Sequence, residues 1–251
     1  MPLLEARGMV RTYGQVVALD GADFDVEAGE VTALIGDNGA GKSTLIKILS
    51  GTEQPDAGSI VFEGAEIRMS SPAQARSLGI ETVYQDLALC PHLDPVNNLY
   101  LGREIKASAP LGWFGFMNRK QMREGSVKAF TDLGATVRRL AEPVGSMSGG
   151  QKQSVAVARA AAWANKIIFL DEPTAALGVV QTANVLDLIR RVRDKGIGVV
   201  LISHSMPEVL DVADRIQVLR RGRRVATYQS SKTSLEELVA TMTGKLDEGA
   251  A

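Results

Sequence analysis

The hydrophobic positions of the chain fall into short apolar runs separated by amphipathic segments. A largely apolar run at 31–35 precedes a Gly-rich turn, and the segment after that turn has a helical pattern that ends at Gly51. Two further strand-like runs occupy 166–172 and 198–204, and between them the apolar residues of 181–196 recur at helical spacing. Strand, helix and strand in this order pair in parallel through right-handed crossovers, so the pattern predicts an α/β fold with a parallel core sheet.

Strand patterns also predict antiparallel pairs on either side of this core. The segment 16–36 indicates two antiparallel strands with turns at Asp20-Gly21 and Ala28-Gly29, followed by the buried strand. The segment 59–69 indicates a hairpin around Glu63-Gly64. We therefore expect an antiparallel β subdomain in the N-terminal part of the chain.

The region 86–145 has a different character. Gly and Pro are scattered through it, strand patterns disappear, and helical patches such as 119–134 take their place. We interpret it as a helical subdomain inserted into a core formed by 1–85 and 146–245, within a single domain that spans 1–251. The tail 246–251 is expected to be frayed.

Composition narrows the functional classes. The 251 residues are 45% hydrophobic and 23% charged, with a net charge of −1, which is ordinary for a folded soluble protein and unlike a nucleic-acid-binding surface. The single cysteine, Cys90, excludes an internal disulfide framework. Neither a signal peptide nor an apolar run long enough to cross a bilayer is evident, so we expect a protein that is soluble or held at a membrane by a partner.

The stretch "GDNGAGKS" fits the spacing Gly-x-x-x-x-Gly-Lys-Ser between a buried strand and a helix. Its glycines let backbone N–H groups turn toward a phosphate chain, and the following helix adds its positive N-terminal end. Lys42 can reach the terminal phosphates, and the Ser43 hydroxyl can bind Mg²⁺. The expected phosphate-binding residues are Gly36, Asp37, Asn38, Gly39, Ala40, Gly41, Lys42, Ser43 and Thr44.

Two adjacent acids follow the buried strand of 166–172. This strand delivers Asp171 toward the metal side of the phosphate loop, and Glu172 can polarise the attacking water. A strand that ends in two solvated acids is the alternative. Beside a phosphate loop, the pair indicates a nucleoside triphosphatase.

The stretch "SGGQ", Ser148 to Gln151, has no evident role of its own. Ser148 can cap the helix that follows, with Gly149 and Gly150 leaving backbone N–H groups open to an anion. A flexible turn before a helix is the alternative.

The order of the phosphate loop, Gln85 after a strand, "SGGQ", "FLDEPT" and "LISH" resembles the ATP-binding-cassette (ABC) family, from Tyr13 to at least His204. The resemblance implies a P-loop NTPase cassette with a RecA-like core. It implies that Tyr13 stacks on adenine, that Gln85 contacts Mg²⁺ and water, and that His204 contacts the γ-phosphate. Each of these three could instead be an ordinary structural residue. The implied catalytic set is Lys42, Gln85, Glu172 and His204, and the implied metal ligands are Ser43, Gln85 and Asp171.

The same resemblance implies partners and a location. The segment Ser148, Gly149, Gly150 and Gln151 matches the family signature, which binds the γ-phosphate of ATP held by a second cassette. Membrane-spanning permease subunits and, indirectly, an extracytoplasmic solute-binding protein are the other implied partners. The chain would be a peripheral subunit at the cytoplasmic face of the cell membrane and would not bind nucleic acid.

Two positions depart from the family pattern. Met147 stands where leucine is common before the signature, and Gly178 stands where an aspartate usually links the two cassettes. The version "PTAALG" and the stretch "NLYLGRE" resemble ATPases of bacterial monosaccharide importers. An importer of another small solute, a soluble ABC ATPase of nucleic acids or ribosomes, an exporter ATPase and a non-hydrolysing sensor remain as alternatives.

Two further stretches have a structural and a functional interpretation. "RRGRR", Arg220 to Arg224, could contact nucleic acid, but we favour a charged hairpin turn. "GWFGFM", Gly112 to Met117, could touch a membrane partner, and we favour packing inside the helical subdomain.

Overall fold

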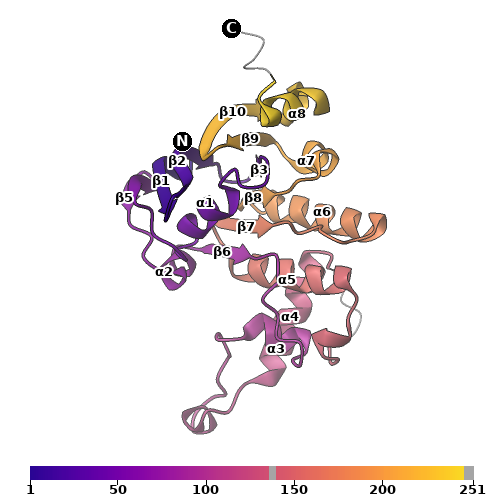
Figure 1. Ribbon diagram of the computed structural model, residues 1–251. Coiled ribbons are helices and arrows are strands. Elements are labelled where there is room, and N and C mark those ends of the chain that lie inside the picture. Colours follow the sequence, from indigo (N-terminus) through magenta and orange to yellow (C-terminus); the bar gives the residue numbers. More distant parts are fainter. Residues whose placement is uncertain (136–139, 246–251) are drawn as a thin grey trace. The chain divides into compact units, whose positions relative to one another are not determined.

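The computed structural model describes residues 1–135 and 140–245 (Figure 1). Its contacts divide the chain into two compact units. The first comprises Met1–Gln85, Ala164–Pro173 and Ile189–Ala251, and the second comprises Asp86–Trp163 and Thr174–Leu188. The segment 86–145 belongs to the second unit, which also contains the helix after it. The expected tail 246–251 lies outside the described residues.

A six-stranded sheet forms the centre of the first unit, in the order β10-β9-β3-β8-β7-β6. The five strands from β9 to β6 pair in parallel, which confirms the predicted parallel core. All residues of β3 and β8 are buried, as expected for strands covered on both faces. The strands are β3 (Val31–Ile35), β6 (Ile80–Val83), β7 (Ile167–Asp171), β8 (Gly198–Ile202), β9 (Arg215–Arg220) and β10 (Arg223–Gln229).

The hairpin of β9 and β10 turns at Arg221-Gly222, where both residues have positive φ. The interpretation of "RRGRR" as a charged hairpin turn is therefore confirmed. The remaining short elements of this unit are α2 (Pro72–Ser77), α7 (Met206–Val212), the 3₁₀ turn Ser230–Lys232 and α8 (Leu235–Thr243).

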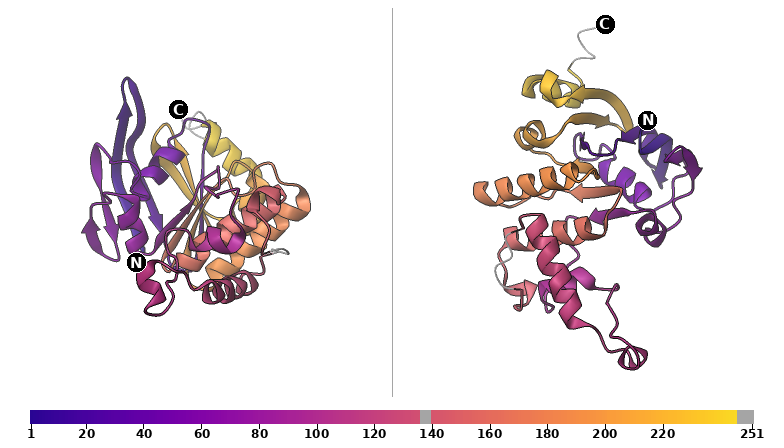
Figure 2. Two further views of the ribbon diagram at one scale, coloured as in Figure 1. Left: turned by 90° about the horizontal axis from the view of Figure 1, so that it is seen from below. Right: turned by 180° about the vertical axis from the view of Figure 1, so that it is seen from behind.

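A four-stranded antiparallel sheet, in the order β2-β1-β4-β5, accompanies the parallel sheet (Figure 2). The helix α1 (Lys42–Leu49) contributes Leu45, Ile46, Ile48 and Leu49 to a core that both sheets share. The predicted hairpin at Glu63-Gly64 is confirmed between β4 and β5. The strands are β1 (Leu4–Tyr13), β2 (Val16–Val26), β4 (Ala57–Phe62) and β5 (Ala65–Ile67).

The predicted turn at Asp20-Gly21 is wrong, because β2 continues through it. Met9 pairs with Ala22 and Val10 with Asp20, so Gly21 is an extra residue in the ladder, with a φ of +77°. This is a β-bulge, which uses the same glycine freedom as a turn but bends the strand without reversing it. The reversal lies earlier, after Tyr13, where Gly14 has a φ of +59°.

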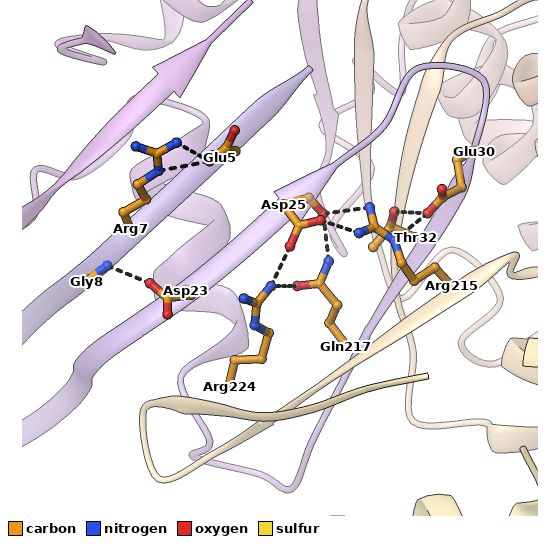
Figure 3. Close-up of polar contacts among 10 residues, drawn as sticks. All are labelled: Glu5, Arg7, Gly8, Asp23, Asp25, Glu30, Thr32, Arg215, Gln217 and Arg224. Atoms are coloured by element: carbon orange, nitrogen blue, oxygen red, sulfur yellow. Dashed lines mark hydrogen bonds and ion pairs between the residues drawn. The ribbon is translucent and has the colours of Figure 1, made fainter. Parts of the chain in front are cut away.

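Ion pairs join the antiparallel sheet to the edge of the parallel sheet (Figure 3). Asp25 on β2 accepts hydrogen bonds from Arg215 on β9 and from Arg224 on β10. The Nε of Arg215 also donates to Oε1 of Glu30 at 2.6 Å. The amide Nε2 of the buried Gln217 donates to the Asp25 carbonyl at 2.6 Å. The charged and amide groups at this contact between the sheets therefore serve as one another's hydrogen-bond partners.

The second unit contains α3 (Pro95–Tyr100), α4 (Arg119–Asp132), α5 (Gly149–Trp163), the first part of α6 (Val179–Asp194) and the 3₁₀ turns Leu111–Phe114 and Val144–Ser146. The α5 helix packs with α3 and α4. The indole of Trp163 donates to the Leu99 carbonyl at 2.8 Å and meets the Tyr100 ring edge-on, with 5.5 Å between the ring centroids. Among the described residues, no helix combines the length and apolarity needed to span a bilayer.

The interpretation that "GWFGFM" packs inside the helical subdomain is wrong. Trp113 is 84% exposed, Phe114 78% and Phe116 59%. These residues lie in an excursion between α3 and α4, closed at its base by the bridge between Lys106 and Met117. The aromatic side chains stay in solvent.

Candidate active site

An open cavity of about 830 Å³ lies in the first unit, at the ends of its parallel strands. Ligands of open α/β sheets bind in this place, outside the carboxyl ends of the strands. Its volume is within the range of small-molecule sites. The lining residues are Tyr13, Val16, Ala18, Gly36–Thr44, Gln85, Asp171, Glu172, Ile202, His204 and Met242. The structure thus gathers every predicted residue of the phosphate loop, metal and catalytic sets around one cavity.

The phosphate loop connects β3 to α1 and is held from behind by backbone contacts. The Gly222 N–H donates to the Ala40 carbonyl at 2.9 Å, and the Ala40 N–H donates to the Asp37 carbonyl at 3.1 Å. Gly36 has a φ of +154°, and a Cβ there would lie 2.1 Å from the Leu219 carbonyl oxygen. A side chain at Gly36 is therefore excluded both by its backbone conformation and by the strand behind it.

Lys42 is the first residue of α1, and its side chain curls back over the loop. Its Nζ donates to the carbonyls of Gly36 at 2.6 Å and Asp37 at 3.0 Å. Burial lowers the pKa of Lys42, and the carboxylates of Glu172, Asp37 and Asp171 oppose that shift. The loop thus presents a cation and the positive end of a helix at one point, which suits a polyphosphate.

The two acids at the end of β7 have different surroundings. Burial, followed by the neighbouring charge of Glu172, raises the pKa of Asp171, while Lys42 opposes the shift. Glu172 has a φ of +49°, and its N–H donates to the Ile202 carbonyl at 2.9 Å. This hydrogen bond fixes the strained Glu172 backbone to β8, and the residue is part of the cavity lining.

The structure also shows a contact that the sequence did not predict. The Nδ1 of His204 lies 3.1 Å from Oε1 of Glu172, although the His204 side chain is 69% exposed. Residues that follow two neighbouring strands, β7 and β8, meet here because parallel strands end at the same edge of the sheet. Glu172 and His204 thus form one polar pair beside the phosphate loop.

The expected metal ligands suit Mg²⁺. Ser43, Gln85 and Asp171 offer a hydroxyl, an amide oxygen and a carboxylate around the same cavity. A cation would relieve the burial cost that raises the pKa of Asp171. Within 1–135 and 140–245, no group of three or more His, Cys, Asp or Glu could hold a metal by itself. This donor set fits Mg²⁺, which completes its shell with phosphate oxygens and water.

The signature segment belongs to the second unit. The Gln151 N–H donates to Oγ of Ser148 at 3.4 Å, and the Ser148 N–H donates to Oε1 of Gln151 at 3.0 Å. This reciprocal capping box confirms that Ser148 starts the α5 helix. Gly150 leaves no room for a side chain, since a Cβ there would lie 2.6 Å from Cγ of Gln181.

Gly178, which replaces the usual aspartate, comes directly before α6. The Thr182 N–H donates to its carbonyl at 2.9 Å. A Cβ at Gly178 would meet only the flexible end of Gln181, with Oε1 at 2.8 Å, and φ is not positive there. The local backbone therefore does not require a glycine at this position.

Sequence reasoning missed part of the cavity lining. Val16, Ala18 and Met242 carry no motif, and Met242 is contributed by α8, far along the chain. Arg11 and Glu53, which contact Tyr13, were also missed. The position of Arg11 two residues before Tyr13 on β1 was the available signal for it.

Comparison with known proteins decides the family. The family model described as ABC transporter matches residues 19–175, which is more than half of the chain. The chain belongs to the ABC transporter family. The predicted resemblance is confirmed, and so is ATP hydrolysis as the activity class of the cassette.

Two relatives of this ABC cassette match it over nearly their whole length. It is 50% identical over 245 residues to the fructose import ATP-binding protein FrcA of Rhizobium meliloti, covering 97% of this chain and 94% of that protein. It is 47% identical over 251 residues to the xylose/arabinose import ATP-binding protein XylG of Sulfolobus acidocaldarius, covering 98% of each. It is also 41% identical to the ribose import ATP-binding protein RbsA 1 of Rubrobacter xylanophilus, of which it spans about half (47%).

Solved structures confirm the cassette fold. MJ1267, an ATP-binding cassette of an ABC transporter, superposes with a TM-score of 0.81 at 28% identity, covering 99% of this chain and 98% of that one. Its ADP conformation superposes with a TM-score of 0.78 at 29% identity, covering 97% and 95%. The roles of the individual site residues, in the cavity and in the signature segment, remain predictions.

Proposed function

We propose that this ABC cassette is the ATP-hydrolysing subunit of an importer for a monosaccharide. The observation that carries the proposal is its similarity, at 50% and 47% identity and nearly full coverage, to proteins named for the import of fructose and of xylose or arabinose. The cavity retains Lys42, Asp171, Glu172 and His204 together, which favours a hydrolysing subunit over a nucleotide sensor. An importer of another small solute is the alternative.

Each side chain has a defined task in hydrolysis. Lys42 and the N-terminus of α1 hold the terminal phosphates, and Glu172 orients and polarises the water that attacks the γ-phosphate. His204, paired with Glu172, contacts γ-phosphate oxygens. Ser43, Gln85 and Asp171 would hold Mg²⁺, which would neutralise charge on the phosphates.

The signature segment serves the ATP of a second cassette. The capping box at Ser148 and Gln151 leaves the first N–H groups of α5 available to an outside acceptor. As the family signature implies, we expect the phosphate that they bind to be supplied by another copy. ATP then increases the affinity between two cassettes, since it binds to both.

Permease subunits hold the chain at the cytoplasmic face of the cell membrane, as a peripheral subunit. Gln85, at the end of β6 and in the cavity lining, is the residue through which we expect the permease to sense the nucleotide. The extracytoplasmic solute-binding protein acts only through the permease. Nucleic acid is not a partner, in keeping with the net charge of −1.

Uptake in cells tests this function. Deleting the gene should abolish uptake of labelled fructose, xylose, arabinose or ribose, and the wild-type gene should restore it while Glu172→Gln should not. Glu66→Gln, which changes an exposed glutamate on β5, is the matched control and should restore uptake. Loss of uptake of a different solute would instead show that the chain serves an importer of that solute. Unchanged uptake, together with a chain that does not sediment with permease-containing membranes, would contradict the transport function.

A further inference from the structure

Tyr13 at the edge of the cavity is held by charged side chains that no motif marks. The residue is 40% exposed and lines the cavity. Its hydroxyl donates a hydrogen bond to the Glu53 carboxylate. The guanidinium of Arg11 lies over the ring, 5.0 Å from its centroid. A tyrosine at the end of a strand thus has both its hydroxyl and one ring face engaged.

The residues that hold Tyr13 are themselves fixed. The Nη1 of Arg11 donates to Oδ1 of Asp56 at 2.8 Å, and the Thr12 N–H donates to Oδ2 of the same carboxylate at 2.7 Å. Asp56 therefore ties the Arg11 side chain to the backbone of β1. Arg11 lies two residues before Tyr13, on the same face of the strand, which places its cation over the ring.

Glu53 is fixed from the other side, by the end of α1. Its N–H donates to the Lys47 carbonyl at 3.1 Å, and its Oε1 lies 3.3 Å from the Lys47 ammonium. The Tyr13 hydroxyl, followed by Lys47 and Arg11, lowers the pKa of Glu53, so the carboxylate is ionised at neutral pH. Glu53 and Arg11, which together hold Tyr13, are called the clamp below. Through Lys47, Glu53 is fixed to α1, the same helix that begins at the phosphate loop.

We propose that Arg11 and Glu53 are positioning residues for nucleobase recognition. They hold the Tyr13 ring with one face covered by the guanidinium, which leaves the other for stacking against the base of the bound nucleotide. The inference rests on the proposed role of Tyr13 and adds that the ring is oriented before the nucleotide arrives. Preorganisation of this kind spares the ordering of an aromatic side chain on binding.

We expect the clamp to affect the affinity for ligands that carry a nucleobase and to leave the affinity for ligands without one unchanged. We compare the Kd of Mg-ATP with that of Mg-tripolyphosphate, which contacts the phosphate loop but has no base. Tyr13→Phe and Glu53→Gln should each weaken ATP binding by about three- to tenfold, the cost of ordering one side chain, with tripolyphosphate unchanged. Tyr13→Ala should weaken ATP binding by at least about tenfold, since it removes the stacking surface.

A double-mutant cycle identifies the shared hydrogen bond. Tyr13→Phe combined with Glu53→Gln should be no weaker than either single variant, because both remove the same bond. Steady-state kinetics should show a raised KM for ATP with little change in kcat. Tyr228→Phe is the matched control, because it removes another tyrosine hydroxyl, bonded to Thr241 Oγ1 at 2.7 Å and outside the cavity lining. It should leave the ratio of the two Kd values unchanged.

The outcomes separate the inference from the function on which it rests. If Tyr13→Ala weakens ATP binding but Tyr13→Phe and Glu53→Gln do not, the positioning role of the clamp is wrong. The stacking role of Tyr13 is then retained. If Tyr13→Ala leaves ATP binding unchanged, the stacking role of Tyr13 is wrong, and so is the positioning role of Arg11 and Glu53. Equal weakening of ATP and tripolyphosphate by Glu53→Gln would show general damage to the phosphate loop and would also overturn the inference.

Discussion

Replacing Glu172 with glutamine lowers ATP turnover by at least ~10²-fold, the scale of a lost general base, and leaves ATP binding intact. Glutamine keeps the shape of the side chain and can still hydrogen-bond to Nδ1 of His204, which lies 3.1 Å from the present carboxylate. It removes the negative charge that, in the proposed mechanism, polarises the attacking water. The loss therefore falls on the chemical step and spares the phosphate contacts of Lys42.

The measurement is steady-state ATPase activity of the purified protein, with the Kd for ATP determined in parallel. Glu66→Gln makes the same chemical change at an exposed position on β5 and is expected to keep normal turnover. Near-normal turnover of Glu172→Gln would reject Glu172 as the catalytic carboxylate. Loss of ATP binding in this variant would instead assign Glu172 a role in holding the nucleotide.

Much of the fold follows from patterns that extend over several residues. The apolar runs of β3, β7 and β8 are buried almost throughout, so a simple hydrophobic pattern identified them and their parallel order. The phosphate loop was predictable because its glycines, lysine and serine stand at fixed spacing between such a strand and a helix. The cap at Ser148 was predictable in the same way, from a polar residue before a helix, whereas its reciprocal bond with Gln151 is a finding of the structure.

Other features depend on packing between distant segments. Gly21 suits a turn and a bulge equally, and only the register of β1 against β2 decides between them. The exposure of Trp113 could not be predicted, because apolar residues usually indicate a core and no local signal shows that a covering layer is missing. The pairing of Glu172 with His204 arises where two strands end at one edge of the sheet.

Replacing Gly36 with alanine should destabilise the protein far more than the same change at Gly39. Both glycines belong to the phosphate loop and both have positive φ, +154° and +81°. A Cβ at Gly36 would lie 2.1 Å from the Leu219 carbonyl oxygen, whereas a Cβ at Gly39 meets nothing within 4 Å. Gly39→Ala therefore adds backbone strain alone, ~1–2 kcal/mol. Gly36→Ala adds strain and steric overlap, together ~3 kcal/mol or more.

Urea denaturation of the two variants and the wild type measures these differences in the free energy of unfolding. The Kd for ATP should rise more for Gly36→Ala, because the loop must move away from Leu219 and its N–H groups lose their alignment. Equal destabilisation by the two substitutions would show that contact with β9 does not determine the loop, and that backbone conformation alone does.

Disulfide trapping tests whether the Ser148 segment of one copy completes the ATP site of another. Asn38 in the phosphate loop and Ser148 before α5 are both exposed. We place Asn38→Cys and Ser148→Cys in a chain that also carries Glu172→Gln and Cys90→Ser, so that ATP persists and the native thiol is absent. The protein is oxidised with and without Mg-ATP and separated on a non-reducing gel, beside chains that carry one new cysteine each. We expect a band at twice the monomer mass that requires both cysteines and Mg-ATP. A disulfide formed efficiently within single chains, with no dimer band, would exclude this pairing and would make Ser148 part of its own chain's site.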